Sequence, residues 1–140
     1  MTVATICTRL PETVSGTDTV LRAAQRMLSQ DVGTLVVADA EGVPEGIVTD
    51  RDIVIRCVAE EQAPEKTRIR DVMTHDVHTV HEDESVEAAL EMMADKQVRR
   101  LIVVNSAGRV SGIVSLDDFL EGVVAAAEDI GRLLRRQVHV

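Results

Sequence analysis

The sequence predicts a mixed α/β protein of the α+β type, made of two similar β-α-β-β-α units, and three observations support this prediction. Residues 12–54 align with residues 78–120 at a constant offset of 66, without a gap and with thirteen identical positions. Most of the identical residues are apolar or glycine, the types that a shared core and shared turns retain. In both segments, a stretch with helical spacing precedes two short runs rich in β-branched residues.

The first unit contains an amphipathic helix and a β-hairpin. Apolar residues recur at steps of three and four across residues 20–28, after Asp18, a plausible neighbour of the N-cap. Two short apolar runs follow, and Gly42 in the turn between them can adopt a positive φ. The predicted order is a short strand at 13–14, a helix at 20–28, strands at 35–38 and 46–48, and a second helix after Thr49.

The second unit repeats this order and ends in a longer helix. Its elements are a strand at 79–80, a helix at 86–94, strands at 101–104 and 112–114, and a helix after Ser115. Residues 61–70 lack an apolar period and contain Pro64, so they are predicted to be the linker. We therefore divide the chain into a first repeat with its linker, residues 1–66, and a second repeat with a C-terminal helical extension, residues 67–140.

Each unit is too small to be stable by itself, so the two are expected to fold together. A unit of about 60 residues is marginal, whereas 140 residues can bury a substantial core. We expect the units to pack sheet to sheet around a pseudo-two-fold axis with a shared core. The C-terminal helix carries an apolar stripe between Phe119 and Leu134, which packs either on its own unit or on a second copy in a homodimer.

The composition excludes several classes of function. The formal charge of -9 and the lack of Trp and Tyr argue against binding nucleic acid, because phosphates are repelled and bases find no stacking platform. No apolar run approaches the roughly 20 residues that span a membrane, and the first ten residues do not resemble a secretory signal. Cys7 and Cys57 form no Cys-x-x-Cys pair. We expect a cytoplasmic protein with reduced cysteines.

Each unit places a hydroxyl and a carboxylate where the second hairpin strand enters a helix. Thr49 and Asp52 are three residues apart in the first unit, and Ser115 and Asp118 have the same spacing in the second. This is the spacing of a capping box, in which both side chains bind backbone N–H groups. It also suits a nucleotide, because a helix N-terminus binds phosphate and a carboxylate can accept hydrogen bonds from a ribose diol. The glycine three residues before each hydroxyl would let a flat base approach the strand.

These features resemble a tandem pair of cystathionine beta-synthase (CBS) domains, also called a Bateman module. The resemblance covers about residues 6–124 and rests on the element order, the repeat, the two Gly-hydrophobic-hydrophobic-Thr/Ser-x-x-Asp corners and the strand entry Val98-Arg99-Arg100-Leu101. It implies a regulatory adenine-nucleotide sensor rather than an enzyme, dimeric, with ligand clefts between the repeats. The chain departs from the family pattern at Val36 and Ile102, where proline is common, and we expect this to alter the base pocket more than the fold.

The resemblance also implies roles for individual residues and a set of ligands and partners. The expected ligand is AMP, ADP or ATP, with no catalytic cofactor, and the regulated target is an unidentified effector protein. Asp52 and Asp118 would hold the ribose, Thr49 and Ser115 would lie near phosphate, Ile47 and Ile113 would line the base, Val98 and Arg99 would face the first corner, Val32 and Gly33 would face the second, and Arg100 would contact phosphate.

The two corners differ in charge. Arg51 lies in the first corner where Asp117 lies in the second, and the cross-repeat geometry adds Arg99 and Arg100 to the first. The Thr49/Asp52 cleft is therefore expected to bind the more phosphorylated ligand more tightly.

Other kinds of site are disfavoured by residue spacing. His75, His78 and His81 are three residues apart, but a strand-like segment points alternate side chains to opposite faces, so no metal site is predicted. The sequence offers no nucleophile, base and orienting group with the spacing of a catalytic triad. The alternative to a nucleotide sensor is a ligand-free dimerisation or protein-docking module whose corners only cap helices.

Overall fold

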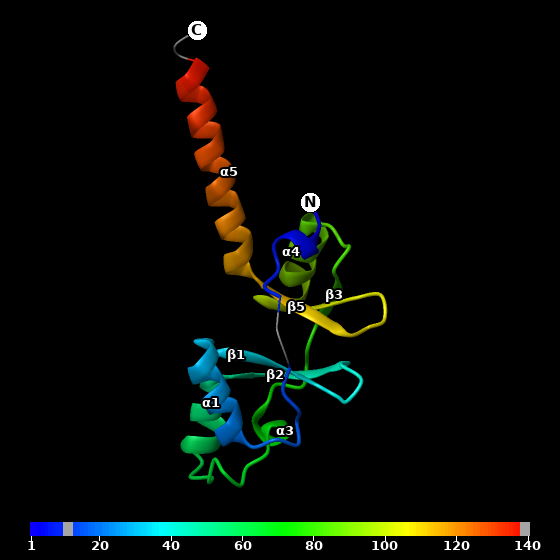
Figure 1. The fold of residues 1–140 in the computed structure, drawn as a ribbon, viewed down its shortest axis with the longest axis vertical. Helices are drawn as coiled ribbons and strands as arrows, with labels where there is room; N and C mark the ends of the chain where they lie inside the picture. The colour runs from blue at the N-terminus through cyan, green and yellow to red at the C-terminus, as the bar shows by residue number, and fades with distance from the viewer. Residues whose placement is uncertain (10–12, 138–140) are drawn as a thin grey trace.

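The computed structural model describes residues 1–9 and 13–137, which form two small sheets flanked by helices (Figure 1). We call the lower part of Figure 1 the first half; its elements are α1 (Val20–Gln30), β1 (Thr34–Ala38), β2 (Pro44–Thr49), α2 (Asp50–Ile53), the π-helix η2 (Val54–Val58) and α3 (Ile69–Val72). The second half holds the 3-10 helix η1 (Val3–Thr5), β3 (Thr79–His81), α4 (Val86–Lys96), β4 (Arg100–Val104), β5 (Val110–Ser115) and α5 (Leu116–Gln137). The α+β fold class is confirmed.

The two sheets have related but unequal topologies. β1 pairs with β2 and β4 with β5, both antiparallel, and the registers match across the repeat because Val36 lies opposite Ile47 and Ile102 opposite Ile113. In the second half, β3 adds a parallel strand beside β4. The strand predicted at 13–14 is not a full strand: within the described residues, Val14 makes a single parallel bridge to β1.

Local sequence signals explain where the helices and turns begin and end. The Thr19 hydroxyl caps α1 by accepting from the Arg22 N–H, and Ser85 caps α4 in the same way. In the hairpin turn after β1, Asp39 Oδ1 accepts from two backbone N–H groups and Gly42 has a φ of 84°, a left-handed conformation that favours glycine. The turn predicted to contain Gly42 with a positive φ is therefore confirmed, and it lies in residues 39–43 between β1 and β2.

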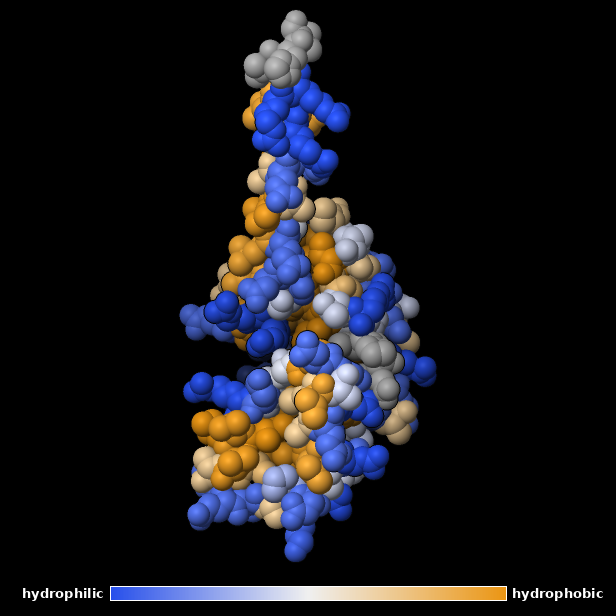
Figure 2. Space-filling view, turned by 60° about the vertical axis from the view of Figure 1, so that its left-hand side comes forward, coloured by the Kyte–Doolittle hydropathy of each residue, from blue (hydrophilic) through white to orange (hydrophobic). Residues whose placement is uncertain are grey.

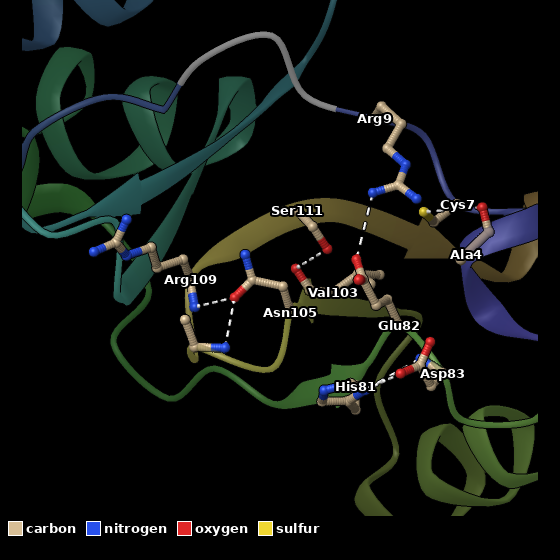
Figure 3. A network of polar contacts seen from close by, with 11 residues as sticks. Ala4, Cys7, Arg9, His81, Glu82, Asp83, Val103, Asn105, Arg109 and Ser111 are labelled. Carbon is tan, nitrogen blue, oxygen red and sulfur yellow. Dashed lines mark hydrogen bonds and ion pairs between the residues drawn. The ribbon is translucent and has the colours of Figure 1, made fainter.

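A short segment of each repeat crosses to the other half of the molecule. We call residues 3–8 and 69–74 the crossing segments. Val3 is fully buried in the core of the second half, and Ile69 is fully buried in that of the first. Arg9, next to the first segment, reaches Glu82 of the second half at 3.4 Å (Figure 3). The predicted linker at 61–70 was therefore too long, because its last residues enter α3 and a core.

The buried side chains form two cores instead of the single shared core that we expected. One cluster lies between α1, α3 and the first sheet, and the other lies between η1, α4 and the second sheet. Val36 and Ile102 belong to neither cluster, yet they are 1% and 0% exposed on the opposite faces of β1 and β4. The two sheets thus face each other, and the Val110 N–H donates to Gly42 O across the halves at 2.9 Å.

The C-terminal helix α5 leaves the body and continues alone (Figure 1). Phe119 near its start is buried in the second core, whereas apolar side chains farther along are exposed. Packing of the whole stripe on its own unit, one of the two expected alternatives, is therefore wrong. None of the helices in the described part of the chain is both long enough and apolar enough to cross a membrane.

Candidate functional site

The first corner forms where β2 ends and α2 begins. The Thr49 hydroxyl accepts from the Asp52 N–H at 3.1 Å, and the Thr49 N–H donates to Asp52 Oδ2 at 3.0 Å, which completes a capping box. The other carboxylate oxygen, Oδ1, lies 3.5 Å from the Arg56 guanidinium one turn along. Both oxygens of Asp52 therefore already have partners within the protein.

The second corner, between β5 and α5, is built from the same backbone with a less crowded carboxylate. Asp118 Oδ2 accepts from the Ser115 N–H at 2.7 Å and from the Ser115 hydroxyl at 3.1 Å, while the Asp118 N–H donates back to that hydroxyl at 3.4 Å. Among the described residues, no group donates to Asp118 Oδ1. The residue that matches Arg56 at the repeat offset is Gly122, which has no side chain to occupy this oxygen.

A polar pocket of about 270 Å³ lies beside the second corner. It is lined by Arg99, Arg100, Ser115, Leu116 and Asp117. The strand register brings these residues together, because Arg100 lies opposite Ser115 and the Leu116 N–H donates to Arg99 O at 2.9 Å. The two arginines that we expected at the first corner thus line a pocket of their own half.

The other residues expected at the site lie around the two corners. Gly33 lies beside Asp50 of its own half, since the Asp50 N–H donates to Gly33 O at 3.0 Å, and Val32 is exposed. Val98 is partly buried against the second core, and the Arg51 N–H donates to Asp50 Oδ1 at 2.8 Å. Their placement across the repeats, and the ligand roles of all these residues, stay predictions.

The glycines before the corners make room for the crossing segments. A Cβ on Gly112 would lie 2.7 Å from Thr8 O, and one on Gly46 would lie 2.8 Å from Thr74 O. The next residues, Ile113 and Ile47, exchange both backbone hydrogen bonds with Thr8 and Thr74 respectively, at 2.8–3.0 Å. The space beside these glycines, where we expected a flat base, is therefore occupied by the backbone of the crossing segments. The backbone N–H and C=O groups of Ile47 and Ile113 are already paired with that backbone.

The crossing segment also brings a cysteine to the second corner. Burial raises the pKa of the Cys7 thiol, the nearby Asp118 carboxylate adds to this rise, and Arg9 opposes it. The thiol donates to Ala4 O at 3.8 Å (Figure 3). Cys7 is thus a neutral thiol beside the corner at neutral pH.

The three histidines do not converge. His75 contacts Arg70 O, His78 lies beside Asp76 and His81 beside Asp83. Within residues 1–9 and 13–137, no three His, Cys, Asp or Glu side chains form a group that could hold a metal ion.

Sequence reasoning missed Arg56, which links the first corner to a crossing segment. Its guanidinium donates to Val72 O at 2.8 Å and to Met73 O at 3.1 Å while facing Asp52. The signal was present, because Asp52 and Arg56 have the i,i+4 spacing of a helical ion pair.

Comparison with known proteins agrees with the repeat and the fold. The uncharacterized protein MK0525 of Methanopyrus kandleri is 38% identical over 109 residues, which cover 78% of this chain and 56% of that protein. Inosine-5'-monophosphate dehydrogenase of Methanocaldococcus jannaschii is 38% identical over 126 residues, 87% of this chain but 24% of the enzyme. The chain thus spans about half the length of the first relative and a quarter of the second.

A solved structure matches the fold over most of both chains. The CBS domain pair of protein MJ0100, in complex with 5'-methylthioadenosine and S-adenosyl-L-methionine, has a TM-score of 0.77 and 28% identity, covering 90% of this chain and 98% of that one. The family model of the CBS domain matches residues 3–58 and again residues 69–125. These two matches begin 66 residues apart, the offset of the internal repeat, and the chain therefore belongs to the CBS domain family as a tandem pair.

Proposed function

We propose that the chain is a regulatory module that senses an adenosine-containing ligand, with AMP, ADP or ATP as the expected nucleotides. The observation that carries the proposal is the second corner, where Asp118 keeps one carboxylate oxygen available beside a pocket with two arginines. The complex of MJ0100 with S-adenosyl-L-methionine and methylthioadenosine supports the adenosine part of the ligand.

The chemistry of the second corner suits each part of a nucleotide. The open oxygen of Asp118 can accept a hydrogen bond from a ribose hydroxyl. Arg99 and Arg100 can bind phosphate with charge-assisted hydrogen bonds, and the start of the 22-residue helix α5 adds its positive dipole end. Ile113 and Val98 are the apolar residues that we expect nearest to the base.

We also propose that the second corner binds the more phosphorylated ligand more tightly than the first. At the first corner, with Thr49, Arg51 and Asp52, a ribose competes with Arg56 for the carboxylate. This reverses the expectation drawn from charge alone, because Arg99 and Arg100 line the pocket at Ser115.

Isothermal titration with AMP, ATP and S-adenosyl-L-methionine as probes tests the proposal. We expect Asp118→Ala to weaken binding about tenfold or more, because a hydrogen bond to a charged group contributes about 1.5–3 kcal/mol. Ser85→Ala is the matched control, since it removes a helix cap of the same kind away from either corner. If the folded Asp118→Ala variant binds the probes with the same affinity as the parent protein, Asp118 only caps the helix and does not bind the ligand.

The alternative is a ligand-free dimerisation or protein-docking module, and it makes the opposite prediction in the same experiment. If none of the three probes binds the parent protein, the alternative is favoured. A thermal shift gives a second readout, because a ligand at 100 times its Kd stabilises the folded protein by about 2.7 kcal/mol.

We infer that the chain regulates a reaction rather than catalysing one. Its match to the dehydrogenase covers 87% of this chain but 24% of that enzyme, so the likeness is confined to about a quarter of the enzyme. An external effector protein, a homodimer and a cytoplasmic location belong to the same proposal. Cys7 and Cys57 are both free thiols, which fits a reducing compartment.

A further inference from the structure

The two corners share a backbone but differ in what faces the second carboxylate oxygen of the aspartate. At the second corner, Asp118 Oδ2 accepts from Ser115, and no group in the part of the chain that the structure describes donates to Oδ1. At the first corner, Asp52 Oδ2 accepts from the Thr49 N–H, and Oδ1 lies 3.5 Å from the Arg56 guanidinium. The oxygen that is open at one corner therefore faces an arginine at the other.

The backbone of a crossing segment holds Arg56 in this position. Its Nη1 donates to Val72 O at 2.8 Å and to Met73 O at 3.1 Å. The same atom forms the ion pair with Asp52, whose side chain is only 13% exposed. Moving the guanidinium away from the carboxylate therefore costs two charge-assisted hydrogen bonds as well as the ion pair.

The second corner has room for an arginine at the matching position but holds glycine there. Gly122 is the residue that matches Arg56 at the offset of 66, and a Cβ built on it meets nothing within 4 Å. The other crossing segment offers backbone at the matching positions, Ile6 and Cys7. This difference in access to the two aspartates thus rests on one side chain.

We propose that Arg56 blocks nucleotide binding at the first corner, so that this corner stays empty at concentrations that fill the second. The inference rests on the proposed function, because it assumes that the aspartate of a corner accepts hydrogen bonds from a ribose. A carboxylate can bind a ribose diol only through oxygens that the protein leaves open, and Arg56 faces the oxygen of Asp52 that is left. Figure 2 shows the surface hollowed between the two halves, with hydrophilic residues on both sides of the hollow.

Isothermal titration with AMP and ATP as probes tests the block by removing it from the first corner. The parent protein should bind one equivalent tightly. Arg56→Ala should bind a second equivalent about tenfold more tightly than the parent does, which is the effect of one hydrogen bond to a charged group. Arg22→Ala is the matched control, because Arg22 pairs with Asp18 at the same i,i+4 spacing away from both corners, and its titration should match that of the parent.

The reverse substitution places the block at the second corner. Gly122→Arg should weaken the tight site about tenfold, because the introduced arginine lies one turn after Asp118, as Arg56 lies after Asp52. Since a side chain at position 122 has room, this variant tests the inference even where Arg56→Ala fails to fold.

A rescue assigns the new site to the first corner. Asp118→Ala should lose tight binding, Asp118→Ala/Arg56→Ala should regain one equivalent, and adding Asp52→Ala should abolish it again. A purely structural role of Arg56 would give no rescue.

The outcomes separate this inference from the proposed function on which it rests. Two sites of equal affinity in the parent, no stronger second site in folded Arg56→Ala, or an unchanged tight site in Gly122→Arg overturns the block and leaves the proposed function in place. If neither probe binds the parent or any variant, the proposed function fails and this inference fails with it.

Discussion

At the residue scale, Arg56 makes the two corners different although their backbones match. It faces Asp52 and at the same time donates to two carbonyls of the crossing segment at residues 69–74. Gly122 holds the equivalent position in the second half and can do neither. Arg56, which has no counterpart in the second half, thus connects the first corner to the crossing segment at residues 69–74.

The substitution Arg56→Ala should lower the free energy of unfolding by about 1–2 kcal/mol, because the backbone carbonyls of Val72 and Met73 lose a charged hydrogen-bond donor. The matched control is Arg51→Ala, which removes the same charge from an exposed position on α2. Urea denaturation measures the difference. Equal stability of the two variants would show that the contacts of Arg56 contribute nothing.

The pKa of the Cys7 thiol depends on Asp118 of the second corner. Its pKa is raised first by burial and then by Asp118, so the neutral thiol is favoured in the folded protein. The raised pKa of Cys7 therefore contributes to the stability of the folded protein below the ordinary thiol pKa of 9.0. This contribution is lost as the pH rises through the pKa that the thiol has in the folded protein.

We expect Asp118→Asn to lower the pKa of Cys7 and so to speed its alkylation by iodoacetamide at pH 8, since the thiolate is the reactive form. Asp117→Asn, one residue earlier, should leave the rate unchanged. The rate of modification, followed by mass spectrometry, distinguishes Cys7 from the buried Cys57. Equal rates in the two variants would contradict the proximity of Cys7 and Asp118.

At the scale of elements, each hairpin is extended by one residue from the other repeat. Thr8 and Thr74 form antiparallel bridges to Ile113 and Ile47, and the preceding glycines leave room for this backbone. A pairing of this kind tolerates no side chain at the contact, so the glycines are required by packing and not by a turn.

A Cβ at position 112 would displace the backbone of Thr8, so Gly112→Ala should destabilise the second half by about 1–3 kcal/mol. Gly122→Ala is the control within the same half, because a Cβ there meets nothing within 4 Å and alanine is the better helix former. Thermal denaturation should give a lower melting temperature for the first variant and an unchanged or higher one for the second. The reverse order would exclude a structural role for this contact.

The sequence predicted the helices, hairpins and corners because each has a local signal. Helical spacing predicted α1 and α4, and the turn glycines predicted both hairpins. The crossing segments were missed although the offset of 66 continues into them, where Thr8 matches Thr74, because short segments have no period of their own. Packing across the halves depends on tertiary contacts, and for the same reason the place of Arg99 and Arg100 could not be derived from spacing.

At the scale of the whole molecule, the exchanged segments make the two halves interdependent. Each core contains a fully buried residue from the opening segment of the other repeat, Val3 in one and Ile69 in the other. Neither half therefore holds its complete core when it is cut at the repeat boundary.

Deleting residues 1–8 should destabilise the second half more than the first, because it removes Val3 from the second core and the bridge to Ile113. Hydrogen exchange should show faster exchange of the β4 amides, while those of β1 change less. Uniform loss of protection in both sheets would mean that the halves unfold as one unit.

The exchange of segments also determines the order in which the two cores can form during translation. Val3 leaves the ribosome before the residues that enclose it in the second core, the last of which is Phe119. The first core can close once residue 73 has emerged, whereas the amino-terminal segment must wait for more than a hundred further residues to be translated. A segment that is translated before the whole first core can therefore pack into its own core only after the first core is complete.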